Sequence, residues 1–235
     1  MTIHFFKEID HVKSKILALG AQVESRLQAA IAGLVEENAE LLQKVIDTDV
    51  EIDELEVELE EECLKVLALH QPVAIDLRFV VAALKINSDL ERIGDLAVNV
   101  AERSLYLVSR ARADVSFDFP RMAGKVQRML RCSIEALVNV DVKAASGVCA
   151  ADDAVDAMNR EMYALIKQAM AKDPDPDNIN KLIHILGISR DLERIGDHAT
   201  NIAEDIIYMV EGKIIRHHAE AYVSDHVAAE DADSA

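Results

Sequence analysis

The sequence predicts an all-α protein built as two tandem three-helix bundles (six helices) from an internal duplication. The segment Asp89–Asp95 (DLERIGD) returns letter for letter as Asp191–Asp197, 102 positions later. Hydrophobic residues make up 51% of the 235 residues, with only 8 Gly and 4 Pro to interrupt helices. Aromatic residues are 4% and Trp is absent, so packing must rest on aliphatic side chains, as in helical bundles.

The first half of the chain predicts three helices. Apolar residues recur at three- and four-residue steps from Ile9 to Leu34, which indicates a long amphipathic helix ending near residue 38. A second apolar line begins at Leu41 and ends where Pro72 breaks the pattern. The third helix begins after that proline and extends toward Arg110, so three helices make one unit.

The second half repeats this plan. Pro120 suits the first turn of a new helix, which we expect to run to about Val148. A fifth helix is expected from about Asp152 to Lys172, and a turn containing two prolines precedes the sixth. Short connections then favour antiparallel neighbours within each bundle.

These elements divide the chain into three parts. Residues 1–112 form the first predicted bundle, residues 113–216 form the second, and residues 217–235 read as an acidic, disordered tail. Because the repeated segments and the proline-marked turns keep one order, we expect residues 1–112 and 118–216 to superimpose.

Charge and cysteine usage narrow the range of functions. The formal net charge of −18 argues against binding of nucleic acid or of anionic lipid, and favours cationic or metal partners. The three cysteines show no metal or redox spacing, which favours reduced thiols and a reducing compartment. No apolar run approaches the roughly 20 residues of a membrane span. We therefore expect a cytoplasmic protein without direct membrane insertion.

Acidic residues recur at helical spacing in both halves. Glu91 and Asp95 stack one turn apart on a helix, as do their copies, and a D-x-x-x-D pair precedes each repeated segment. Stacked like charges cost about 0.2–0.5 kcal/mol per pair, so a cation is the natural compensation. Two such helices side by side could bridge hard or borderline cations, and an all-oxygen site suits Mg, Mn or Fe. The candidate metal ligands are Asp49, Asp53, Glu91, Asp95, Asp152, Asp156, Glu193 and Asp197.

Other interpretations of these residues stay open. The acids could be ordinary surface groups of an acidic protein, neutralised by the neighbouring Arg92 and Arg194. His198 stands where the first copy has Leu96, so it either adds a nitrogen ligand to the second site or faces solvent. The glycine before each second acid would let a helix or a ligand approach the backbone closely.

Catalytic motifs are not evident in the sequence. Ferritin-type di-iron chemistry would need two Glu-x-x-His motifs, and only Glu8–His11 matches. We find no Walker motif, dinucleotide fingerprint or Ser-His-Asp order. A binding or regulatory role, without enzymatic chemistry, is therefore favoured.

Taken together, these motifs resemble those of the PhoU family, accessory regulators of bacterial phosphate-specific transport. The resemblance rests on Asp89–Glu102, Asp191–Asp205, Gln71–Arg78 (QPVAIDLR), Val45–Asp49 (VIDTD) and Tyr208–Gly212 (YMVEG). It implies a fold of six helices in two bundles, with multinuclear metal clusters on the bundle surfaces in some members, held by E/D-x-x-x-D motifs. The four acidic pairs named above match that pattern. The clusters would contain Fe, Mn, Mg or Zn.

The resemblance also implies a function. The protein would be a negative regulator of the phosphate-starvation response, an adaptor between the ATPase of the phosphate-specific ABC importer and a phosphate-sensing histidine kinase. Its partners would bring it close to the inner membrane, and we expect a homodimer. The alternative class is a metal-dependent phosphohydrolase or a metal-storage helical bundle, in which clustered carboxylates activate water or hold ions.

Overall fold

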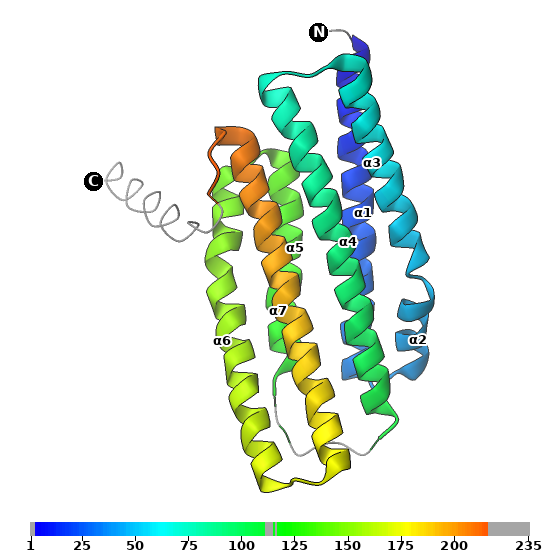
Figure 1. The fold of residues 1–235 in the computed structure, drawn as a ribbon, viewed down its shortest axis with the longest axis vertical. Helices are drawn as coiled ribbons and strands as arrows, with labels where there is room; N and C mark the ends of the chain where they lie inside the picture. The colour runs from blue at the N-terminus through cyan, green and yellow to red at the C-terminus, as the bar shows by residue number, and fades with distance from the viewer. Residues whose placement is uncertain (1–2, 111–114, 116, 216–235) are drawn as a thin grey trace, which may run out of the picture.

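The chain folds into long antiparallel α-helices. The computed structural model describes residues 3–110, 115 and 117–215, and within these ranges it contains helices and connecting turns but no strand (Figure 1). The helices are α1 (Ile3–Val35), α2 (Ala39–Asp47), α3 (Val50–His70), α4 (Ala74–Val108), α5 (Phe119–Asn139), α6 (Val142–Lys172) and α7 (Pro176–Glu211). The all-α prediction is confirmed.

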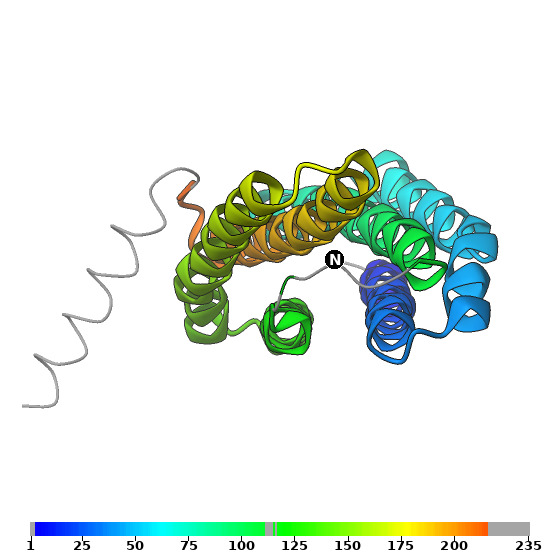
Figure 2. The ribbon, with the colours of Figure 1, turned by 90° about the horizontal axis from the view of Figure 1, so that it is seen from below.

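The helices form two bundles side by side. The first bundle contains α1 to α4, where α2 and α3 together make up the predicted second helix, and the second contains α5 to α7 (Figure 1). Viewed along the bundle axis, α4 and α7 lie in the middle, with α1 and α5 on one side of them (Figure 2). The two helices that carry the repeated segment are therefore packed against each other at the centre of the molecule.

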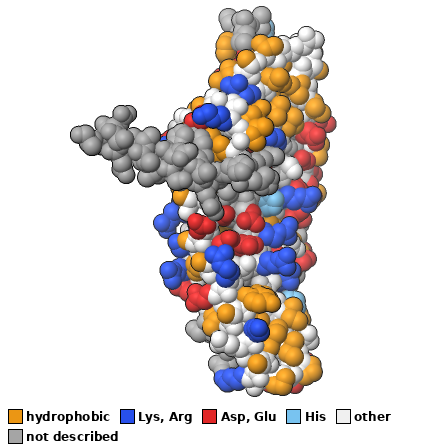
Figure 3. Space-filling model, turned by 60° about the vertical axis from the view of Figure 1, so that its left-hand side comes forward, with side chains coloured by type: hydrophobic (Ala, Val, Ile, Leu, Met, Phe, Trp, Pro, Cys, Tyr) orange, Lys and Arg blue, Asp and Glu red, His pale blue; other side chains and the backbone are white. Residues whose placement is uncertain are grey.

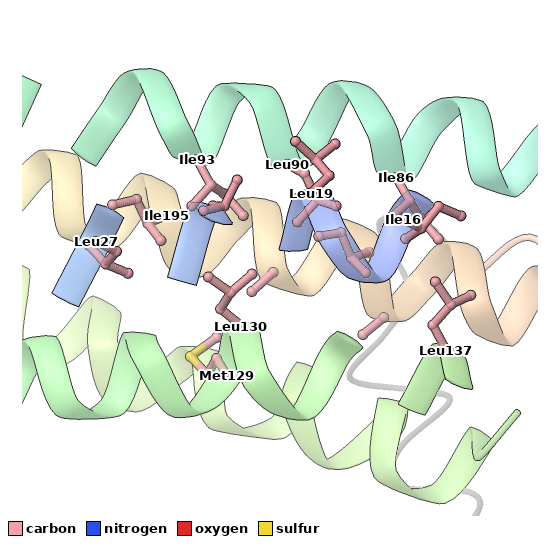
Figure 4. Close-up of a cluster of buried hydrophobic side chains, with 14 of the residues drawn as sticks. Ile16, Leu19, Leu27, Ile86, Leu90, Ile93, Met129, Leu130, Leu137 and Ile195 are labelled. Carbon is pink, nitrogen blue, oxygen red and sulfur yellow. The ribbon is translucent and has the colours of Figure 1, made fainter. Parts of the chain in front are cut away.

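The hydrophobic core is continuous across both bundles. Side chains from α1, α4, α5 and α7 point toward one another in one cluster (Figure 4). Each large aliphatic side chain buried there contributes roughly 1.5–3 kcal/mol relative to exposure. The labelled members are Ile16, Leu19, Leu27, Ile86, Leu90, Ile93, Met129, Leu130, Leu137 and Ile195.

Short polar side chains fix where several helices begin. The side-chain oxygens of Asn38, Asp118, Asp141 and Asp175 each accept a hydrogen bond from a backbone N–H in the first turn of the following helix. Such caps satisfy donors that have no partner inside the helix and contribute about 1 kcal/mol each.

The turn between α5 and α6 lies elsewhere than predicted. We expected one helix to run to about Val148 and the next to start at about Asp152, but α5 ends at Asn139 and α6 begins at Val142. Val140 is the left-handed C-cap, with φ 55° and ψ 40°. The boundary prediction was wrong because apolar residues continue across the turn, while its sequence signal was the single capping residue Asp141.

The predicted second helix is broken at Thr48 and Asp49. Thr48 ends α2, donating a hydrogen bond from Oγ1 to the Lys44 carbonyl at 3.0 Å, and Asp49 precedes α3. Asp49 therefore lies at a helix break rather than within a continuous helix. Neither Gly nor Pro marks this position, so the break has to be explained by tertiary contacts.

Two of the family-resembling motifs meet at one end of the molecule. Arg78 of the QPVAIDLR segment donates from Nε to the Met209 carbonyl at 3.1 Å, near the end of α7. Gly212 ends that helix with φ 72°, a left-handed conformation suited to glycine. The start of α4 thus holds the end of α7.

Three further predictions concern membrane spans, the acidic tail and the boundaries of the two halves. Among the described residues, no helix is both long and apolar enough to cross a membrane. The predicted acidic tail, residues 217–235, lies outside the described residues. The superposition of the two halves and their boundaries at residues 112 and 216 stay predictions.

Candidate metal centre

The second bundle gathers three carboxylates at one point. One oxygen each from Asp152 and Asp156 of α6 and from Asp197 of α7 lie within 4.8 Å of one another. Within the described residues, this is the one group of three or more His, Cys, Asp or Glu side chains that meets this distance. Figure 3 views the side of the molecule on which α6 lies, where acidic side chains gather at mid-height between basic ones. We call Asp152, Asp156, Glu193 and Asp197 the second acidic cluster.

Asp152 is the most perturbed member of this cluster. Burial, followed by the charges of Asp197 and Asp156, raises the pKa of Asp152 to about 7. Its Oδ1 is buried and has no hydrogen-bond partner among the described residues. A buried carboxylate oxygen without a donor carries an unfavourable desolvation energy, which a cation would offset.

Glu193 completes the second acidic cluster from α7. Its pKa is raised by burial and by the charges of Asp197 and Asp156, while a hydrogen bond with Asn159 opposes the shift. Asn159 also accepts a hydrogen bond from Ser189 Oγ at 2.9 Å. Asn159 is a site residue that the sequence did not suggest, since it belongs to no acidic pair.

The corresponding acids of the first bundle already have a cationic partner. We call Asp49, Asp53, Glu91 and Asp95 the first acidic cluster. Arg26 of α1, only 7% exposed, donates from Nη1 to Asp49 Oδ1 at 2.8 Å. Its other terminal nitrogen donates to the Thr48 carbonyl. Arg26 thus binds both the carboxylate and the backbone at the break between α2 and α3.

Arg92 neutralises the other half of the first acidic cluster. Its Nε lies 3.5 Å from Glu91 Oε2, and its Nη1 donates to Asp95 Oδ2 at 3.2 Å. The Arg92 side chain is 59% exposed, so these ion pairs are worth at most about 1 kcal/mol. Neutralisation of the acids by Arg92, one of the interpretations left open by the sequence, therefore applies to the first acidic cluster. Arg26 is a second, buried residue that neutralises it.

His198 takes neither of the roles considered from the sequence. Its Nδ1 lies 2.8 Å from Oδ1 of Asp89 on α4, and Asn201 donates to the same oxygen at 3.3 Å. Both His198 and Asp89 are mostly buried. His198 therefore links the two bundles instead of facing solvent or the acidic cluster.

The repeated glycines have different surroundings. A Cβ at Gly94 would lie 3.0 Å from Ile52 Cδ1, so α3 approaches α4 closely there, as expected. A Cβ at Gly196 would meet Asp152 Oδ1 at 3.5 Å and Met129 Cε at 3.6 Å, which are ordinary contacts. A side chain would therefore find more room at Gly196 than at Gly94.

Comparison with known proteins agrees with the duplicated helical architecture. A family model described as the PhoU domain matches residues 16–104 and again residues 119–206. The chain belongs to the PhoU family. Its relatives include phosphate-specific transport system accessory protein PhoU homologs from Pseudomonas putida and Pseudomonas aeruginosa. The first is 35% identical over 91% of this chain and 83% of the relative, and the second 36% identical over 91% and 88%.

Solved PhoU structures share the fold. The crystal structure of PhoU from Pseudomonas aeruginosa matches with a TM-score of 0.85 at 35% identity, covering 89% of this chain and 100% of that one. The phosphate transport system regulatory protein PhoU from Streptococcus pneumoniae matches with a TM-score of 0.78 at 26% identity, covering 89% and 98%. The recognition of the PhoU family from the sequence is confirmed.

The two clusters differ in how well they suit the metal clusters that PhoU resemblance implies. The second offers only oxygen donors, three of them close together, and a buried oxygen without a partner. Such a donor set fits hard cations such as Mg, Mn or Fe better than Zn, which prefers nitrogen and sulfur. In the first, the guanidinium of Arg26 already holds Asp49. The assignment of all eight acids as metal ligands stays a prediction.

Proposed function

We propose that this protein regulates phosphate uptake, as an accessory protein of a phosphate-specific transport system. The supporting observation is a likeness that spans nearly the whole chain in both sequence and structure, to relatives named for that role. The lengths agree as well, since the match covers most of each relative. The regulator would repress the phosphate-starvation response when phosphate is plentiful.

We propose further that it works as an adaptor rather than as an enzyme. Its partners would be the importer's ATPase and a sensor histidine kinase, and it would act in the cytoplasm, close to the membrane through them, as a homodimer. A rigid bundle offers long helical faces for such contacts. Large apolar side chains are exposed around the turn from α3 to α4, where Leu69 is 68%, Val73 66% and Ile75 55% exposed. Adjacent exposed apolar residues are typical of protein-binding surfaces.

The second acidic cluster would serve this regulator as a binding site for a divalent or iron cation. A bound cation would offset the repulsion among Asp152, Asp156 and Asp197 and fix α6 against α7. Its role would be to rigidify the second bundle and not to activate water for catalysis. Purified protein loaded with Mn or Fe should therefore leave phosphoesters unhydrolysed.

A deletion strain tests the adaptor function. Without this protein, phosphate-starvation genes should be expressed in phosphate-rich medium, and the intact gene should restore repression. A variant with Leu69→Ser and Val73→Ser should fold normally but fail to restore repression and to crosslink with the ATPase or the kinase. A matched control, Tyr163→Ser at a side chain 62% exposed in the other bundle, should restore both. Normal repression in the deletion strain would contradict the proposal.

A further inference from the structure

The two acidic clusters occupy equivalent places in the two repeats, but their neighbours differ. The pair Asp49 and Asp53 and the pair Asp152 and Asp156 are 103 positions apart. At the same offset, the buried residues of α1 match buried residues of α5: Leu19 with Met122, Val23 with Val126, Leu27 with Leu130 and Ala30 with Ser133. The offset that aligns the acids therefore also aligns the buried faces of α1 and α5.

At this offset of 103 positions, Arg26 of α1 corresponds to Met129 of α5. Both are buried, at 7% and 3% exposure. Arg26 donates to Asp49 at 2.8 Å, whereas the Met129 methyl and Asp152 Oδ1 lie within 3.6 Å of one point, the Cβ position of Gly196. Arg26 thus contacts the first acid of its cluster, Met129 lies near the first acid of the other, and only Arg26 carries a positive charge.

The helix that carries the first acid also differs between the two bundles. In the first bundle Arg26 binds the Thr48 carbonyl at the break between α2 and α3. In the second bundle α6 runs unbroken from Val142 to Lys172, through the position of Asp152. A thioether cannot donate a hydrogen bond to a carbonyl or a carboxylate. Asp152 Oδ1 consequently has no partner among the described residues.

We propose that Arg26 takes the place of a metal ion in the first acidic cluster, and that Met129 leaves the second open, so that this chain binds divalent cations in its second bundle only. A guanidinium delivers a fixed positive charge and two directed hydrogen bonds to the Asp49 region. A cation entering there would have to displace the buried guanidinium of Arg26 from Asp49. At the second acidic cluster, the exposed Arg160 pairs with Asp156 at 3.3 Å. Asp152 Oδ1 has no partner among the described residues, so a positive charge beside it has to come from solution.

Residue 26 and residue 129 therefore decide which bundle carries the ion. This inference rests on the metal-binding part of the proposed function. That function is tested by substitutions in the second acidic cluster of the otherwise wild-type protein, which should remove Mn²⁺ binding. Exchange of residues 26 and 129 tests the inference itself.

The experiment measures Mn²⁺ bound per chain by equilibrium dialysis of untagged, chelator-treated full-length protein. Wild-type binding should be abolished by Asp152→Asn with Asp197→Asn and unchanged by Asp49→Asn with Asp95→Asn. Met129→Arg should abolish it as well. Arg26→Met should add a second class of sites, roughly doubling the Mn²⁺ bound, and adding Asp49→Asn to that variant should remove the gain.

Several results would overturn the inference. Wild-type Mn²⁺ binding that falls equally on substitution of either cluster would do so, as would an Arg26→Met variant that gains none. If the wild-type protein binds no Mn²⁺, its proposed metal site fails, while a gain in Arg26→Met still supports the role of Arg26. Circular dichroism verifies the folding of each variant. Should Arg26→Met not fold, retention of Mn²⁺ by Met129→Arg would contradict the inference independently.

Discussion

Arg103 of α4 donates from Nε to Oδ2 of Asp191 of α7 at 2.7 Å, which joins the two bundles through the first residue of the repeated segment. Asp191 is only 5% exposed. In the first repeat the same position is Asp89, whose partner is His198. Both copies of this aspartate thus lie between α4 and α7, and each contacts a different side chain of the opposite helix.

Arg103→Met should destabilise the protein by roughly 2 kcal/mol. Loss of one partner leaves a buried carboxylate unpaired, and the cost falls below that of a fully buried pair because the Arg103 side chain is 35% exposed. Burial already raises the pKa of Asp191, and Arg103 opposes that shift. The variant should therefore lose more stability at pH 8 than at pH 5 in urea unfolding. Arg92→Met, at a largely exposed pair, is the control and should cost under about 1 kcal/mol. Equal costs for the two variants would contradict this.

Asp152→Asn should stabilise the metal-free protein at alkaline pH. Asp152 has a pKa of about 7 in the folded protein and near 4 in the unfolded chain. Its protonation therefore contributes stability that is complete below about pH 4 and is lost as pH rises through 7. In chelator, the variant should be more stable than wild type by on the order of 2 kcal/mol at pH 8, with little difference near pH 4. Urea unfolding at both pH values measures this difference, and equal stabilities of the two proteins at pH 8 would contradict the prediction.

Gly196→Ala should be tolerated better than Gly94→Ala. Alanine in a helix interior is favoured over glycine by about 1 kcal/mol, and the new methyl group at Gly196 meets only ordinary contacts. At Gly94 the methyl would press on the Ile52 side chain at 3.0 Å, which offsets that gain. Thermal unfolding should rank the Gly196 variant above the Gly94 variant. The reverse order would show that the spacing between α3 and α4 is not restrictive.

Val140→Gly should stabilise the protein by about 1 kcal/mol. Val140 has φ 55°, which is strained for a β-branched residue, and its side chain is 48% exposed, so little burial is lost. Val138→Gly is the matched control, at a side chain 51% exposed but within α5. It should be destabilising, because glycine is a poorer helix former than valine and Val138 lies in the last turn of α5. Chemical denaturation of both variants checks the opposite signs.

The sequence predicted the parts of the fold that depend on periodicity. Helix order and antiparallel pairing follow from apolar spacing and from the repeated segment. Two boundaries were not predicted, since the apolar pattern continues through Val140 and neither Gly nor Pro marks the break at Thr48. In the site, the convergence of Asp152, Asp156 and Asp197 followed from the duplication. The ion pair of Arg26 did not, because Arg26 belongs to no repeated motif and its partners, Asp49 and the Thr48 carbonyl, lie beyond the end of its own helix.

The hydrophobic core that the two bundles share determines how the protein unfolds. Because α4 and α7 bury side chains against each other, neither repeat encloses a complete core by itself. A polypeptide limited to one repeat would expose a broad apolar helix face to water and would self-associate. The intact chain should instead melt cooperatively, in a single calorimetric transition, although its sequence contains two copies of one domain.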